Sequence, residues 1–100
     1  EMLCLDEPTT YLDIYYQLEL LELVKELNNK HGLTIVMVLH DINQAIRYSD
    51  HIILMKNGQI VAEGLPREVI TKEVIKEVYD VNAVFHEDEQ LGLYMMPLSI

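Results

Sequence analysis

Two short apolar runs separated by a helical pattern constrain the fold of this chain more than any other feature. Residues 2–5 are continuously apolar and lead into Asp6-Glu7-Pro8, and residues 34–39 form a second apolar run rich in β-branched side chains. Short, continuously apolar runs are typical of strands that are buried on both faces of a parallel sheet. We therefore expect two such strands, with Cys4 buried as a small hydrophobic residue.

The segment between the two runs predicts an α-helix. Asp13 offers an N-cap and Gly32 a C-terminal stop. Between them, apolar residues recur at helical spacing, at Ile14, Leu18, Leu21, Val24 and Leu27. The order strand, helix, strand predicts a parallel, right-handed βαβ unit, in which both strands end at the same edge of the sheet.

The rest of the chain predicts smaller elements. Asp41 can cap a short helix through Ile46, and Asn57-Gly58 between residues 51–55 and 59–62 is a strong hairpin signal. Pro66 and Thr71 open two small peripheral helices, at residues 67–70 and 72–79, and residues 83–96 suggest a last hairpin around the acidic turn 86–90. No linker or repeat divides the sequence, so we expect residues 1–100 to belong to one domain of the α/β class.

The charge balance excludes some partners. Seventeen acidic and seven basic residues give a net charge of −10, which repels nucleic acids and anionic lipid surfaces. No apolar stretch approaches the roughly 20 residues that cross a bilayer. We therefore expect no nucleic-acid binding and no direct insertion into a membrane. The single cysteine fits a reducing cytosol.

Asp6 and Glu7 are the residues that point to chemistry. A strand that delivers two adjacent carboxylates to the carboxyl edge of a sheet resembles the arrangement beside the phosphates in nucleotide hydrolases. Alone, the pattern also describes a strand that simply meets solvent. His31, His51 and His86 lack metal-ligand spacing. We interpret three other groups structurally: Tyr15, Tyr16 and Tyr48 as half-buried packing, Met95-Met96 as core or hairpin, and Glu87-Asp88-Glu89 as a solvated turn.

The context of these carboxylates resembles a known family. Asp6-Glu7-Pro8-Thr9 resembles the Walker B motif of ABC ATPases with its adjoining catalytic glutamate, Tyr11-Leu12-Asp13 resembles the D-loop, and His40 is similar to the switch histidine of the H-loop. Order and strand placement agree for all three. The chain is thus identified as similar to the C-terminal part of the P-loop NTPase domain of an ABC ATPase, from Walker B onward. Its sequence as far as about Tyr79 resembles the sequences of the ATPases of iron-siderophore, haem and cobalamin importers.

The resemblance implies roles for four residues. Asp6 would hold Mg²⁺ through its water shell, and Glu7 would act on the attacking water as general base or orienting acceptor. His40 would hydrogen-bond the γ-phosphate of ATP, and Asp13 would lie at the interface with a second ATPase subunit. The implied cofactors are ATP and Mg²⁺. The implied partners are that second subunit and a transmembrane permease, which would hold the protein on the cytoplasmic face of the cell membrane.

The positions of the glycines predict that the chain is incomplete as an enzyme. The sequence has glycine only at Gly32, Gly58, Gly64 and Gly92, so it contains no Gly-x-x-x-x-Gly-Lys-Ser/Thr phosphate loop. The family's glutamine lid loop and Gly-Gly signature are missing too, and an apolar run begins at Met2 with no preceding cap or linker. We expect a fragment of a longer protein, with an exposed strand edge that favours self-association.

The first prediction concerns the isolated chain, which we expect to show no ATP hydrolysis above background and no millimolar-range affinity for ATP, because nothing in it grips the phosphates. Mg-ATP turnover that disappears on Glu7→Gln would contradict this.

Two alternatives to an importer subunit remain at this point. One is a non-transport ABC ATPase of the translation or DNA-repair type, which normally has a different D-loop sequence or long coiled-coil insertions. The other is a structural or regulatory fragment without activity. The intact Asp6, Glu7 and His40 argue against the latter.

Overall fold

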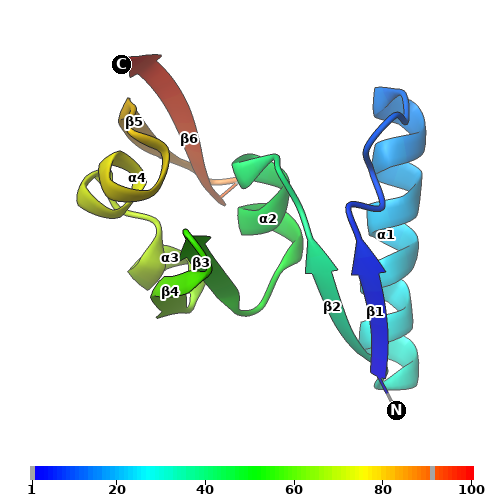
Figure 1. Ribbon diagram of the computed structural model, residues 1–100. Helices are drawn as coiled ribbons and strands as arrows, with labels where there is room; N and C mark the ends of the chain where they lie inside the picture. Colours follow the sequence, from blue (N-terminus) through cyan, green and yellow to red (C-terminus); the bar gives the residue numbers. More distant parts are fainter. Residues whose placement is uncertain (1, 91) are drawn as a thin grey trace. The chain divides into compact units, whose positions relative to one another are not determined.

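The computed structural model describes residues 2–90 and 92–100, and it divides into two compact units, Glu1–Asp41 and Ile42–Ile100. Each unit is described by itself. Both combine helices with small two-stranded sheets, so the chain is of the mixed α/β class (Figure 1). Within the described residues, no helix is both long enough and apolar enough to cross a membrane.

The first unit is the predicted βαβ unit. It contains β1 (Met2–Asp6), α1 (Ile14–His31) and β2 (Thr34–Val38). The two strands are parallel, with Met2 opposite Thr34 and Asp6 opposite Val38. Both strands therefore end at the same edge, as their apolar runs and the intervening helix predicted.

The ends of α1 lie where the sequence placed them. Asp13 precedes the helix with an extended backbone, and its carbonyl accepts a hydrogen bond from the Gln17 amide at 2.9 Å. The Asp13 side chain makes no capping hydrogen bond, so its position was predicted correctly but its side-chain cap was not. Gly32 ends the helix in the left-handed conformation, with φ of 64°, and its amide donates to the Asn28 carbonyl at 3.1 Å.

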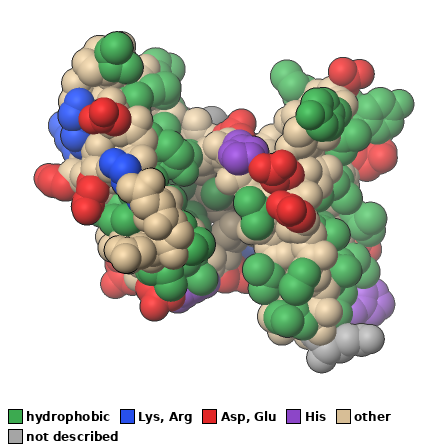
Figure 2. Space-filling view, viewed as in Figure 1, with side chains coloured by type: hydrophobic (Ala, Val, Ile, Leu, Met, Phe, Trp, Pro, Cys, Tyr) green, Lys and Arg blue, Asp and Glu red, His purple; other side chains and the backbone are tan. Residues whose placement is uncertain are grey.

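Burial in the first unit corrects one prediction. Leu21 of α1 is fully buried, but side chains along both strands alternate between partly buried and exposed. Met2 is 62% exposed and Val36 and Val38 are each 50% exposed, and Figure 2 shows apolar side chains at the surface over these strands. The prediction of strands buried on both faces was wrong, because this two-stranded sheet has a single helix in its unit, enough to cover one face.

Two smaller predictions about burial were also wrong. Cys4 lies on the uncovered face of β1 and is exposed rather than buried. Tyr15 and Tyr16, which we expected to be half-buried, are 68% and 53% exposed and pack edge-to-face on one another, with ring centroids 5.2 Å apart. Tyr48, in the second unit, is half-buried as expected.

The described residues of the second unit form two antiparallel hairpins and three helices. Its elements are α2 (Ile42–Tyr48), β3 (Ile52–Lys56), β4 (Gln59–Gly64), α3 (Pro66–Val69), α4 (Lys72–Tyr79), β5 (Asn82–Asp88) and β6 (Gly92–Ser99). β3 pairs with β4 and β5 with β6.

The predicted turns of the second unit are largely confirmed. Asn57 and Gly58 both have positive φ, 52° and 77°, as a type I′ hairpin turn requires. Thr71 caps α4 through its side-chain oxygen, which accepts from the Val74 amide at 3.2 Å. The last hairpin also forms, but β5 continues to Asp88, so most of the residues expected in the acidic turn lie in a strand instead.

A contiguous core holds the second unit together. Ile75 of α4 is fully buried, and around it lie Ile46, Ile52, Leu54, Val69, Ile70, Ala83 and Met95. The side chain of Asn43 in α2 behaves like a neighbouring strand toward Met95 of β6: its Nδ2 donates to the Met95 carbonyl at 2.9 Å, and its Oδ1 accepts from the Met95 amide at 2.7 Å. The last hairpin is thereby joined to α2, 52 residues earlier.

Candidate active site

The candidate site lies at the carboxyl edge of the sheet formed by β1 and β2. Asp6 is the last residue of β1 and stands opposite Val38, the last residue of β2. The backbone extends this pairing by one residue, since the Glu7 amide donates to the Val38 carbonyl at 3.0 Å. His40 follows β2 by two residues. Parallel pairing therefore brings the ends of two strands, distant in sequence, to one place.

Glu7 and His40 are in direct contact. Glu7 Oε1 and His40 Nε2 share a hydrogen bond between residues 33 positions apart in the chain. The Glu7 side chain is 40% exposed and that of His40 is 75% exposed. A carboxylate and an imidazole that are held together yet open to solvent are suited to accepting a proton from a water molecule or hydrogen-bonding an oxyanion. The sequence predicted a common edge for these two residues, and the structure adds the contact.

Asp6 is placed beside this pair by the chain itself. Its side chain is exposed, on the same face of β1 as Met2 and Cys4. Mg²⁺ in nucleotide sites is typically held by one or two carboxylates, with waters and substrate phosphates completing the shell. One accessible carboxylate at a strand end fits that type of site. Residues 2–90 and 92–100 contain no group of three or more histidine, cysteine or acidic side chains arranged to hold a metal ion by themselves.

The loop from Glu7 to Asp13 has a compact, partly strained backbone. Two successive turns shape it: the Thr10 amide donates to the Glu7 carbonyl and the Leu12 amide to the Thr9 carbonyl, both at 3.2 Å. Glu7 and Tyr11 have left-handed backbones, with φ of 50° and 71°, which costs a non-glycine residue about 1 kcal/mol or more. Such strain persists only where neighbouring contacts fix the conformation.

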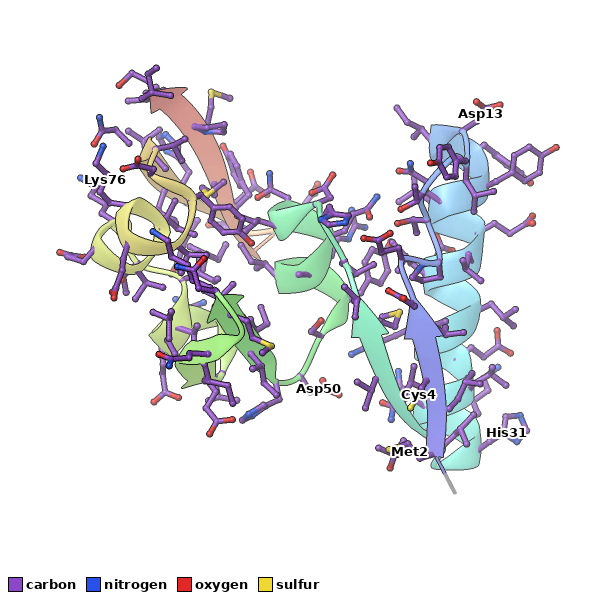
Figure 3. All side chains as sticks on the ribbon, viewed as in Figure 1. Met2, Cys4, Asp13, His31, Asp50 and Lys76 are labelled. Carbon is purple, nitrogen blue, oxygen red and sulfur yellow. The ribbon has the colours of Figure 1, made fainter. Side chains whose placement is uncertain are left out.

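Asp13 lies at the far end of this loop. It stands at the N-terminus of α1, where Figure 3 labels it, and its side chain is exposed. The structure thus joins Glu7 and His40 directly, and Asp6 precedes Glu7 in the chain. Asp13 lies at the other end of the loop that begins at Glu7, outside the hydrogen bond of the pair.

Gln17 belongs to this region although its chemistry was not foreseen from the sequence. Its side-chain Nε2 donates to the Leu12 carbonyl at 2.9 Å and to the Thr9 carbonyl at 3.3 Å. The signal in the sequence is a glutamine four residues after the helix N-cap, from which a long amide can reach back over the preceding loop.

The other histidines have separate surroundings. His31 lies in the last turn of α1, where a cation suits the helix dipole. His51 is 3.6 Å from Glu63, and His86 stacks on Tyr94 with ring centroids 5.6 Å apart.

Curated proteins of similar sequence are ATP-binding proteins of transport systems. The chain is 47% identical over 91 residues to the ferric enterobactin transport ATP-binding protein of Escherichia coli (strain K12), covering 91% of this chain and 34% of that protein. It is 48% identical over 90 residues to a petrobactin import ATP-binding protein of Bacillus anthracis, covering 89% and 33%. A hemin import ATP-binding protein of Shewanella denitrificans is 44% identical over 94 residues, covering 92% and 37%. The chain thus spans about a third of the length of these relatives.

Solved structures show the same fold. A transporter described as of the metal-chelate ABC type, in an inward-facing conformation, matches 97% of this chain and 40% of its own with a TM-score of 0.85 and 23% identity, which speaks to the fold alone. A dimeric ATP-binding cassette bound to ADP and Pi matches 66% of this chain and 28% of its own with a TM-score of 0.61 and 38% identity. No model of a known protein family matches the chain.

Proposed function

We propose, from the premise that the chain belongs to the ATP-binding subunits of ABC transporters, that it is the part of an importer's ATP-hydrolysing subunit from the Walker B strand onward. The names of the relatives favour an iron-siderophore or related metal chelate as the transported substrate. The observation that carries the proposal is the hydrogen bond between Glu7 and His40 beside Asp6, at the carboxyl edge of two parallel strands.

Glu7 and His40 would work as a pair on the attacking water. Because the Glu7 carboxylate is exposed and leaves one oxygen free of His40, it can orient that water or take its proton. The hydrogen bond fixes the imidazole at the same edge, where the imidazolium form of His40, which has a second N–H, would donate to a phosphate oxygen and stabilise its negative charge. Removal of either side chain would therefore leave the other without its orienting partner.

Asp6 would hold the metal side of the reaction. Mg²⁺ bound with ATP neutralises the charge that develops on the phosphate oxygens. The exposed carboxylate of Asp6 is the group of this chain that would bind the ion through its water shell. The phosphate loop would be supplied by parts of the subunit that this sequence does not contain.

Asp13 would serve the assembly rather than the chemistry. Its exposed position at the end of the loop that begins at Glu7 suits a contact with a second ATPase subunit. The further partners in this proposal are the transmembrane subunits of a permease, which would keep the protein at the cytoplasmic face of the membrane.

A fusion protein tests the proposed function. The chain would replace the matching third of the Escherichia coli ferric enterobactin relative, whose remaining two thirds would provide the missing nucleotide-binding parts. We expect the purified fusion to hydrolyse Mg-ATP, since the site residues of this chain would then face the phosphates. A fusion with native-like circular dichroism that binds ATP yet shows no hydrolysis would contradict the proposal.

The uncovered face of the sheet supports a second proposal, that copies of the isolated chain associate. This face presents the exposed side chains of Met2, Cys4, Val36 and Val38, an apolar row that is flanked by Thr34 opposite Met2 and by Asp6 opposite Val38. Two parallel strands with such a row bury it most simply against the same row of another copy. The free thiol of Cys4 lies in the row and would report the contact.

We expect the chain to be dimeric or larger in sedimentation at micromolar concentration and to form a disulfide-linked dimer through Cys4 under mild oxidation. Val36→Lys places a charge in the middle of the row and should yield a monomer. Ile60→Lys is the control, because Ile60 is similarly exposed, at 57%, but lies in the second unit. A cooperatively unfolding, monodisperse monomer of the unmodified chain would contradict the proposal.

A further inference from the structure

The loop between β1 and α1 is held by a side chain that belongs neither to the Walker B motif nor to the D-loop. Gln17 lies one turn into α1, and its carboxamide donates backward along the chain, to the carbonyls of Leu12 and Thr9. A carboxamide NH₂ group has two hydrogens. Gln17 therefore has one for each of two carbonyls three residues apart.

These contacts are made on either side of Tyr11, a residue of the loop with a left-handed backbone. The Thr9 carbonyl accepts one hydrogen bond from the Leu12 amide and a second from Gln17, so both of its lone pairs are used. Thr9 is only 8% exposed. The segment from Thr9 to Leu12, which we call the clamped segment, includes Tyr11. Tyr11 has a left-handed backbone that no side-chain packing supports, since its side chain is fully exposed. At Tyr11 the conformation of the loop thus depends on hydrogen bonds rather than on burial of the side chain.

We propose that Gln17 is a positioning residue of the site, which fixes the loop from Glu7 to Asp13 and so sets how both acidic side chains are presented. The turn that begins at the Glu7 carbonyl ends at Thr10, inside the clamped segment, so a released loop would also release the backbone that holds Glu7 against His40. That this geometry serves ATP hydrolysis rests on the proposed function. The clamp itself does not.

Gln17→Met removes the donors at nearly constant length, and Gln17→Glu removes them at constant shape. Loss of a hydrogen bond of this kind corresponds to roughly tenfold in an equilibrium constant. We expect the amides of Thr10 and Leu12 to exchange with deuterium about tenfold faster in both variants, while the amides of Leu21 and Val24 in α1 keep their protection. The nuclear magnetic resonance signal of the His40 ring should move toward its position in Glu7→Ala, which removes the side chain that His40 contacts.

Glu19→Met is the matched control, at an exposed position of the same helix, and should change neither readout. Unaltered exchange at Leu12 in both Gln17 variants would overturn the clamp. Faster exchange at Leu12 with an unmoved His40 signal would overturn its positioning of Glu7. Both readouts use the chain without nucleotide, so a failure of the clamp is distinguishable from a failure of the proposed hydrolysis.

Discussion

Glu7→Gln in the fusion protein is expected to lower Mg-ATP hydrolysis by about 10²- to 10⁴-fold, the range that a positioned general base contributes. The amide keeps the shape of the side chain and can still hydrogen-bond His40, but it cannot accept a proton from water. Because the contact with His40 and the backbone turn at Glu7 remain possible, the loss should fall on turnover, with ATP affinity nearly unchanged. Initial rates at saturating Mg-ATP, with equilibrium ATP binding measured in parallel, would separate the two.

Glu19→Gln provides the matched comparison for this prediction. It removes the same charge from the exposed surface of α1, so any general effect of charge on the acidic chain appears in both variants. We expect it to retain full activity. The loss of a general base is expected to cost at least about a hundredfold, so a clearly smaller loss in Glu7→Gln would assign the chemistry to another group.

The part of the site that the sequence predicted is the part that depends on chain topology. Apolar runs identified β1 and β2, the helical pattern fixed their parallel order, and this alone requires Asp6, Glu7 and His40 to meet at one edge. Local turn chemistry was equally readable, as Gly32 and Asn57-Gly58 show. Each of these features is decided by a few neighbouring residues, so a single sequence contains the whole signal.

Burial and side-chain partners could not be read in the same way. A continuously apolar strand indicates that both faces can be covered, and not that both are, which is why Cys4 and Val36 are exposed. The two contacts from Gln17 depend on the exact path of a loop with two left-handed residues, Glu7 and Tyr11. Likewise, the pairing of Asn43 with Met95 spans 52 residues and has no local signature.

Leu21 is expected to control whether the site exists at all. It is fully buried, and the only other buried apolar side chain among the described residues of the first unit is Val24. Leu→Ala in a core costs about 2–5 kcal/mol. Units of this size bury too little surface to withstand such a loss, since domains near 40 residues are marginal without other support. Leu21→Ala should therefore separate α1 from β1 and β2 and abolish the contact between Glu7 and His40.

Leu23→Ala is the matched control, because it removes the same atoms from the same helix at a position that is 51% exposed. Its expected cost is within about 0.5 kcal/mol. The measurements are circular dichroism of the chain, amide exchange across α1, and the His40 ring signal. Loss of all three signatures in Leu21→Ala but not in Leu23→Ala would show that the geometry of the site depends on one buried leucine. Equal behaviour of the two variants would mean that the first unit is stabilised chiefly by contacts on its outer surface.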